Sequence, residues 1–193
     1  MVSLNISGQV TNGNLLEPEP GVEIDLGVRG ISDGTFNNNF QTIESTTSSV
    51  DGTFNFSFEN ENLAALRMRF EKESYFSKEV ELTPEDIDIE NGINIDVEMF
   101  SVAQINVTLE NTSPINESDN IEFRFTNANF DCTCCSNEIQ TFTGTDIDTT
   151  LSCFVPGDYN LNYLYIVTKG PSNVLDTGSI TVTPGINELT IDY

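Results

Sequence analysis

The feature of the sequence that most constrains its fold is an alternation of apolar and polar residues with a period of two. In the stretch GVEIDLGV (residues 21–28), every second residue is valine, isoleucine or leucine, and two acidic residues and a glycine lie between them. Such alternation is typical of strands with one buried and one solvated face. The three- and four-residue spacing of an amphipathic helix is almost missing. We therefore predict an all-β protein.

The alternating stretches form two sets of about seven, and seven strands is the usual complement of a β-sandwich. The first set ends with INIDVEM (93–99), whose apolar residues we expect to point inward. The pattern starts afresh with QINVTL (104–109) and continues to the last residue. We therefore predict two tandem seven-stranded β-sandwich domains, 1–101 and 102–193, joined without a Gly-, Pro- or Ser-rich spacer.

Two connections stand out within the first set of strands. Asp51-Gly52 lies between extended runs, and because glycine readily adopts the positive φ of a tight turn, we predict a β-hairpin there. The stretch RGISDGTFNNN (29–39) is predicted to be a long polar loop. We expect this loop, together with the loop that carries the cysteines, to contact a partner.

The charge and composition of the chain exclude several classes of function. There are 31 acidic and 7 basic residues, so the formal charge is -24 and the chain repels nucleic acid and anionic membrane surfaces. Histidine is absent, which removes Ser-His and Cys-His nucleophile pairs and imidazole-ligated zinc. Tryptophan is absent too, which weakens the case for a sugar-binding cleft. We expect no enzymatic activity and no cofactor.

The sequence also bears on the compartment. No run of about 18 apolar residues occurs, so we predict no membrane-spanning segment. The opening MVSLNISGQV has neither a basic region nor an apolar core of the kind found in export signals. Because the strands and cysteines suit an exported protein, we expect that a signal has been removed, in which case a lipid anchor is possible. The alternative is that the protein is not exported by that route.

Several short motifs in the first hundred residues are typical of one known family. They are Gly8-Gln9-Val10, Pro20-Gly21-Val22, Asp51-Gly52-Thr53-Phe54 and Tyr75. With them, this half resembles the carboxypeptidase regulatory-like domain, a transthyretin-like sandwich, although EKES replaces the family's usual glycine before the tyrosine. In the second half, FVPGDYNLNY and GSITVTPGINELTIDY are similar less closely, which indicates a divergent relative or an immunoglobulin-like sandwich.

The resemblance implies a non-catalytic companion domain of secreted and surface proteins. Such domains occur often in Bacteroidetes, and they serve as spacers, adhesive modules or contacts in outer-membrane assemblies. The related hydroxyisourate hydrolases use histidines, which this chain lacks.

The four cysteines are the most specific candidate site. Three of them crowd into DCTCCSNEIQ (131–140). On a strand, Cys132 and Cys134 would share one side and Cys135 the other, which disfavours convergence on one metal ion. Two disulfides suit an even count in an exported sandwich. We expect Cys153 to form a disulfide with Cys132 or Cys134, and Cys135 to form one with whichever of these two remains. A bridge to Cys153 would stabilise the fold by about 3 kcal/mol.

The sequence contains two weaker candidates for a ligand-binding site, one for calcium and one for a glycan. Asp86, Asp88 and Glu90 alternate in EDIDIENG like the start of a calcium loop, but the glycine at position six and the glutamate at position twelve of such a loop are missing. A solvated strand or turn edge is the interpretation that we favour, with calcium as the alternative. Three tyrosines share one face of a predicted strand and could stack on a glycan, but we favour a place in the core: Tyr159, Tyr163 and Tyr165.

Taken together, the sequence predicts a non-enzymatic extracytoplasmic protein that is structural or interactive. Our leading hypothesis is a bacterial cell-surface or outer-membrane accessory component, secreted or periplasmic, that contacts a protein partner. The alternatives are a glycan- or calcium-binding surface module and a filament or virion subunit that assembles through sheet edges.

Overall fold

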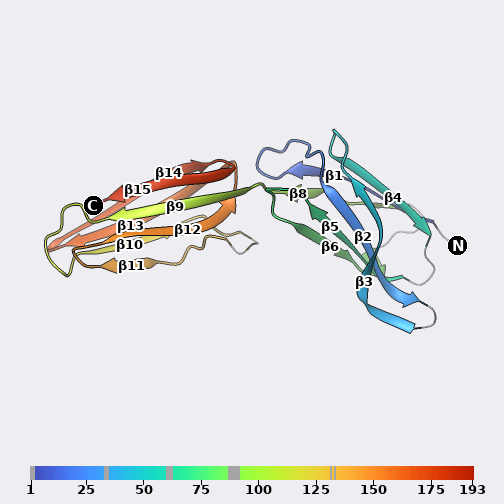
Figure 1. Ribbon diagram of the computed structural model, residues 1–193, viewed down its shortest axis with the longest axis horizontal. Helices are drawn as coiled ribbons and strands as arrows, with labels where there is room; N and C mark the ends of the chain where they lie inside the picture. Colours follow the sequence, from blue (N-terminus) through green and yellow to red (C-terminus); the bar gives the residue numbers. More distant parts are fainter. Residues whose placement is uncertain (1–2, 33–34, 60–62, 87–91, 131, 133) are drawn as a thin grey trace. The chain divides into compact units, whose positions relative to one another are not determined.

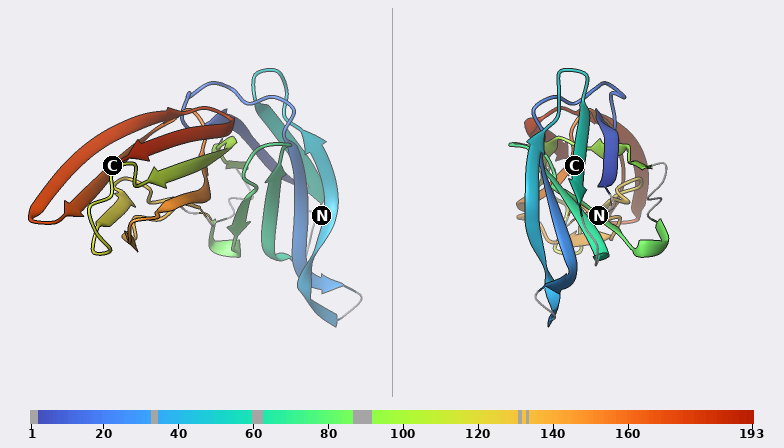
Figure 2. Two further views of the ribbon diagram at one scale, coloured as in Figure 1. Left: turned by 60° about the vertical axis from the view of Figure 1, so that its left-hand side comes forward. Right: turned by 90° about the vertical axis from the view of Figure 1, so that its right-hand side faces the viewer.

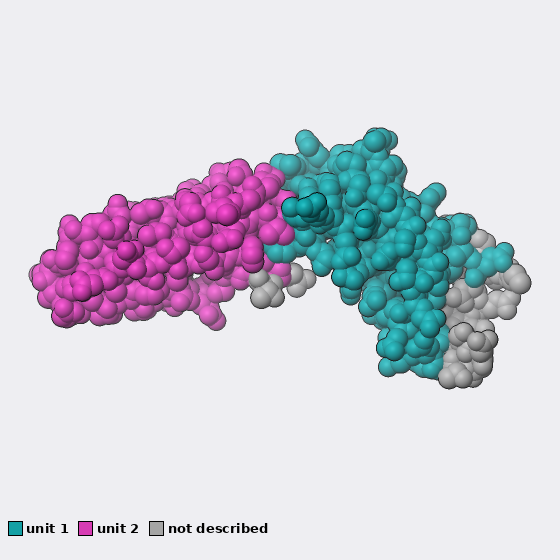
Figure 3. Space-filling view, viewed as in Figure 1, with its two compact units in different colours: residues 1–100 teal, residues 101–193 magenta. Residues whose placement is uncertain are grey.

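The computed structural model describes residues 3–32, 35–59, 63–86, 92–130, 132 and 134–193 (Figure 1). The chain divides into two compact units, Met1–Phe100 (unit 1) and Ser101–Tyr193 (unit 2), coloured separately in Figure 3. In the described parts the secondary structure is strand apart from one 3-10 turn, Pro84–Asp86. The predicted all-β sandwich class is therefore confirmed. No helix among the described residues is long and apolar enough to cross a membrane.

Unit 1 is built from two sheets. In the first, β1 (Ser3–Asn12) lies between antiparallel β4 (Thr53–Glu59) and the parallel strands β7 (Ile93–Asn94) and β8 (Val97–Met99). The second is antiparallel throughout, in the order β3 (Thr35–Thr47), β2 (Glu23–Ser32), β5 (Leu63–Glu71), β6 (Lys78–Leu82).

The core of unit 1 consists of the apolar residues that alternate along these strands. The alternating apolar residues, which include those of the stretches 21–28 and 93–99 expected from the sequence, are buried or packed against the core: Leu4, Ile6, Val10, Val22, Ile24, Leu26, Val28, Phe54, Phe56, Phe58, Leu66, Met68, Phe70, Ile93, Ile95, Val97 and Met99. Gly8 lies on the same face of β1, and a Cβ there would come within 1.8 Å of the Ile95 carbonyl oxygen. Glycine is therefore required where β1 meets the segment between β7 and β8.

The predicted hairpin at Asp51-Gly52 is wrong, although the turn itself is present. Gly52 has a φ of +71°, and its amide donates to the Ser49 carbonyl at 2.9 Å. The strands on either side, β3 and β4, belong to different sheets, and β4 pairs with β1. The turn therefore carries the chain from one sheet to the other, because a local turn does not decide which partner a strand finds.

The prediction of a loop at residues 29–39 is also wrong for the residues of this stretch that the structure describes. Residues 29–32 continue β2 and residues 35–39 belong to β3, and the two strands pair out to Ser32 opposite Thr35. Register shifts occur near Gly27 and Gly30. The shift near Gly30 breaks the period-two alternation, which explains why the sequence did not indicate that the strands continue through residues 29–39.

Unit 2 repeats the arrangement. One sheet has β9 (Val102–Glu110) between antiparallel β12 (Asp148–Pro156) and parallel β15 (Gly185–Asp192). The other is antiparallel in the order β11 (Gln140–Thr143), β10 (Asn120–Phe125), β13 (Tyr159–Lys169), β14 (Ser172–Val182). The long hairpin of β13 and β14 is drawn in orange and red in Figure 2.

The two units share one strand order. In each, the first strand lies between the fourth and the last, and the other sheet runs third, second, fifth, sixth. The tyrosines on β13 belong to the core of unit 2: Leu161 is fully buried, and Tyr159, Tyr163 and Tyr165 pack against the buried cluster. This agrees with the favoured interpretation of these tyrosines as core residues.

Candidate interaction site

All four cysteines form disulfides, but the pairing differs from the expected one. Cys135 bonds to Cys153, and Cys132 bonds to Cys134. The Cys135 amide donates to the Phe154 carbonyl on β12 at 2.9 Å, which places Cys135 beside Cys153. The expectation that Cys153 bonds to Cys132 or Cys134 is therefore wrong. It assumed that the cysteines lie on a regular strand, whereas this segment lies outside the strands and docks along β12.

Asparagines fasten the segment that carries the first three cysteines. Asn137 accepts a hydrogen bond from the Ala128 amide at 2.8 Å and donates to the Asn129 side chain at 2.7 Å. Asn127 accepts from the Asn162 amide of β13 at 2.8 Å. The loop is thus tied to the sheet of β13 by hydrogen bonds and to β12 by a disulfide.

A shallow hollow of about 280 Å³ opens beside the disulfides. It is lined by Phe123, Arg124, Phe125, Cys134, Cys135, Ser136, Glu138, Gln140, Leu151, Ser152 and Cys153. Arg124 and Glu138 are the charged residues of this lining, and the other lining residues are uncharged. The two disulfides therefore share one solvent-connected hollow.

The weak calcium candidate gains no support from the described residues. Asp86 ends the 3-10 turn and accepts hydrogen bonds from the Thr83 hydroxyl at 2.7 Å and the Thr83 amide at 2.9 Å. These bonds, the hydroxyl first, lower the pKa of Asp86 below its usual value. Asp88 and Glu90 lie outside the described residues. Within the described ranges, no group of three or more acidic or cysteine side chains could hold a metal ion.

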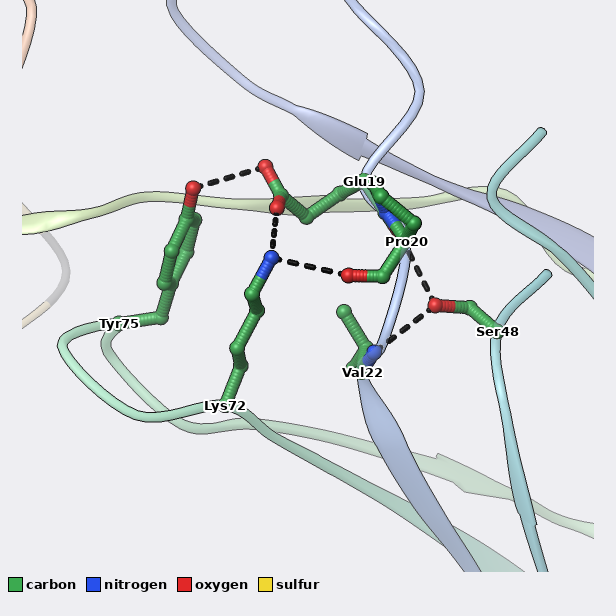
Figure 4. Close-up of polar contacts among 6 residues, drawn as sticks. All are labelled: Glu19, Pro20, Val22, Ser48, Lys72 and Tyr75. Carbon is green, nitrogen blue, oxygen red and sulfur yellow. Dashed lines mark hydrogen bonds and ion pairs between the residues drawn. The ribbon is translucent and has the colours of Figure 1, made fainter. Parts of the chain in front are cut away.

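A buried carboxylate that the sequence did not indicate organises one end of unit 1 (Figure 4). Glu19 is 7% exposed; its carboxylate forms an ion pair with Lys72 and accepts a hydrogen bond from the Tyr75 hydroxyl at 2.8 Å. The Glu19 carbonyl accepts from the buried Ser48 hydroxyl at 2.8 Å, and Ser48 accepts in turn from the Val22 amide at 2.9 Å. The cluster fixes the connection between β1 and β2.

Unit 2 has a buried carboxylate in the corresponding connection between β9 and β10. Asp119 is fully buried and accepts hydrogen bonds from the Ile115 amide at 2.7 Å and from the Asn111 side chain at 3.4 Å. The Ile115 amide is the largest cause of a lowered pKa at Asp119, and the nearby Lys169 charge lowers it further. Lys169 donates to the Asn111 side-chain oxygen at 2.7 Å. With a lowered pKa, Asp119 is ionised at neutral pH and does not supply a proton.

The two lysines occupy one position of the shared topology. Lys72 follows Glu71, which pairs with Glu23 at the start of β2. Lys169 follows Thr168, which pairs with Asn120 at the start of β10. Each ammonium also lies about 5 Å from the centre of a tyrosine ring, at 5.0 Å in unit 1 and 4.9 Å in unit 2. The sequence signal was faint: a lysine directly after an apolar strand, in a chain with few basic residues.

A larger open hollow of about 720 Å³ adjoins Lys72. Three glutamates line it together with Lys72: Glu23, Glu71 and Glu73. Glu23 and Glu71 are direct cross-strand partners, and such a like-charge pair is unfavourable in itself. The hollow is therefore an acidic surface beside the Glu19 cluster.

In the described part of unit 2, the outer edge of β14 is a free sheet edge. This strand pairs with β13 along all eleven of its residues and forms the edge of its sheet. Two of its apolar side chains are largely exposed, Val174 at 55% and Leu175 at 61%. Asp176 accepts hydrogen bonds from the Thr177 amide at 2.8 Å and the Tyr165 hydroxyl at 3.0 Å.

Comparisons with known proteins found no family model and no curated protein that matches this chain. Solved structures similar to it include the Bacillus anthracis TIE protein, at 12% identity and TM-score 0.39. The match covers 99% of this chain but only 34% of the length of the TIE protein. The shaft pilin SpaA of Lactobacillus rhamnosus GG is similar at 9% identity and TM-score 0.38, with 98% of this chain and 97% of the pilin covered. BcpA, the major pilin subunit of Bacillus cereus, is similar at 10% identity and TM-score 0.38, and the match covers 94% of this chain and 69% of BcpA.

These three TM-scores are below 0.5, so we draw no conclusion about family or function from them. The resemblance of the first half to the carboxypeptidase regulatory-like domain stays a prediction.

Proposed function

We propose that this chain is a non-enzymatic structural subunit of an extracytoplasmic assembly, whose copies associate by pairing along the free edge of β14. The observation that carries the proposal is the length and regularity of that edge. β14 runs for eleven residues without a register shift, and its sequence SNVLDTGSITV has neither proline nor lysine. Those are the residues with which proteins usually protect an edge strand from pairing.

The other long edges in the described parts are less suited to pairing. β3 has thirteen residues but shifts register against β2, which twists the strand. β12 has nine residues, ends in Pro156, and is covered at Phe154 by the hydrogen bond from the Cys135 amide. β14 thus offers the longest regular free edge among the described strands.

Hydrogen bonding shows which amides of β14 face outward. The Thr177 amide donates to a side chain, Asp176, and so is not used for the ladder to β13. In an antiparallel pair, the amide and carbonyl of one residue point to the same side, and alternate residues point to opposite sides. The Leu175 and Ser179 amides therefore face outward, and those of Val174 and Asp176 face β13.

The compartment and the charge bear on the proposal in different ways. Two disulfides support an oxidising, extracytoplasmic location. A formal charge of -24 opposes association of copies at low salt. Asp176 is the single charged residue of β14, so the edge itself carries little of that repulsion. Self-association should therefore strengthen as salt screens the remainder of the surface.

Light scattering at rising protein concentration, in low and in high salt, tests the proposal. We expect association that increases with both. Leu175→Pro removes an outward amide and should abolish it without breaking the β13 ladder, whereas Leu175→Ala keeps the amide and should retain most of it. Circular dichroism checks that both variants fold. A chain that stays monomeric throughout, or a Leu175→Pro variant that still associates, would show the proposal to be wrong.

A further inference from the structure

The two disulfides differ in their structural setting. Cys135 is 5% exposed and belongs to the buried core of unit 2, and Cys153 packs against that core. Cys132 and Cys134 are half-buried and do not belong to the core cluster. Their backbone contact is local, a hydrogen bond from the Cys134 amide to the Cys132 carbonyl at 2.9 Å.

The loops that the two bonds close also differ. Cys135 and Cys153 are 18 residues apart and join the cysteine segment to β12, whereas Cys132 and Cys134 are 2 residues apart. Because the chain entropy removed from the unfolded state grows with loop length, the short loop contributes much less to stability. Breaking it separates no strand from another.

From these observations we infer that Cys132–Cys134 is a thiol–disulfide exchange site, which a dithiol reduces while Cys135–Cys153 and the fold stay intact. Exchange requires access to a sulfur atom. The open hollow of about 280 Å³ is lined by Cys134 and also by Cys135 and Cys153, so a thiolate has a route to both bonds. The burial of Cys135, which is 5% exposed, is what protects the second bond. The inference does not rest on assembly through β14.

The exchange balances as a two-electron reaction. One thiolate of the dithiol attacks the sulfur of Cys132 or Cys134, a mixed disulfide forms, and the other cysteine leaves as a thiolate. The second thiolate of the dithiol then attacks the mixed disulfide, which releases the second cysteine and leaves the dithiol as a cyclic disulfide. Two electrons pass to the protein, and the two cysteine sulfurs take up protons according to pH.

Graded reduction of the folded protein tests the inference. The protein is equilibrated with increasing ratios of reduced to oxidised dithiothreitol, alkylated without denaturant, and mapped by peptide mass spectrometry. We expect an intermediate with two labels, on Cys132 and Cys134, and unchanged circular dichroism. The ratio that reduces Cys135–Cys153 should be at least about tenfold higher. Simultaneous appearance of four labels, or first labelling of Cys135 and Cys153, would overturn the inference.

A double variant provides the matched control. Cys132→Ser with Cys134→Ser should lose the two labels seen at low dithiol and keep the melting temperature of the parent protein. A large fall in melting temperature would mean that the short bond is structural, contrary to the inference. The labelling of the unmodified protein, mapped by mass spectrometry, tests the order in which the two disulfides are reduced even if the double variant fails to fold.

Discussion

Unit 1 and unit 2 fold with one strand order, yet they fasten the connection between second and third strands by different means. In unit 1, β2 and β3 pair with each other from Glu23 opposite Thr47 out to Ser32 opposite Thr35. In unit 2, β10 ends at Phe125 and β11 begins at Gln140, and the long segment between them carries three cysteines. Cys135–Cys153 ties that segment to β12. β10 and β11 pair over only four residues, from Asn120 opposite Thr143 to Phe123 opposite Gln140, and beyond that short ladder a covalent bond holds the connection.

The two buried carboxylates show the opposite tendency, because the lysine beside each keeps its position in the topology while the groups that hold the carboxylate differ. Lys72 and Lys169 follow equivalent residues of the fifth strand. The carboxylate of unit 1, Glu19, is held by side chains, Lys72 and Tyr75. The carboxylate of unit 2, Asp119, is held largely by backbone amides. The topology places the cation, and the local loop decides how its partner is satisfied.

The largest expected effect concerns the disulfide that unit 1 lacks. Cys135→Ala with Cys153→Ala should lower the stability of unit 2 by about 3 kcal/mol, because it frees a loop of 18 residues in the unfolded chain. Hydrogen exchange read separately on peptides of each unit measures this. Equal loss of protection in unit 1 would contradict the idea that the bond serves its own unit.

A glycine of unit 1 should give the next largest effect. Gly8→Ala forces a Cβ against the Ile95 carbonyl oxygen, at 1.8 Å if nothing moves, and the cost of such overpacking is about 2 kcal/mol. Exchange protection should fall in β1, β7 and β8 and stay unchanged in unit 2. Gly170→Ala is the control, because no atom lies within 4 Å of its added Cβ, although its φ of +55° adds some strain. A smaller loss for Gly8→Ala than for Gly170→Ala would contradict the packing argument.

The equivalent lysines should differ in their contribution. Lys72→Met leaves the buried Glu19 carboxylate with the Tyr75 hydroxyl and should cost about 1 to 3 kcal/mol. Lys169→Met leaves Asp119 with its amide donors, so we expect a smaller loss. Denaturant titrations of the two variants give the order. An equal or reversed order would mean that the cation, and not the way the carboxylate is held, determines stability.

The smallest effect is a dependence on pH. The Ile115 amide and the other partners hold the pKa of Asp119 below its usual value. A carboxyl whose pKa is lower in the folded than in the unfolded chain stabilises the fold above its unfolded pKa, about 3.9, and this stabilisation is lost as the pH falls through the folded pKa. Asp119→Asn should therefore melt lower than the parent at pH 7, and the difference should shrink below about pH 4. A constant difference in calorimetric melting temperature across this range would exclude ionisation as the cause.

Much of the fold could be predicted because it depends on a local pattern. The inward residues of β2, β7 and β8 followed from period-two alternation, since burial on one face of a strand selects apolar side chains at every second position. The extension of β2 and β3 through residues 29–39 escaped prediction, because a bulge near Gly30 interrupts that period. The pairing of the cysteines could not be predicted from a local pattern either. The sequence indicated two disulfides, but which cysteines pair depends on where the irregular segment that carries them packs against β12.

The sequence by itself therefore determined the class of fold, the division into two sets of strands, the acidic surface and the oxidised state expected of the cysteines. Only the tertiary structure decided which strands pair across Asp51-Gly52, which cysteine meets Cys153, which lysine pairs with Glu19, and which amides hold Asp119. Alternation and composition are properties of neighbouring residues. Pairing, docking and burial of a charge join residues far apart in the chain, and their energies depend on positions that no local pattern specifies.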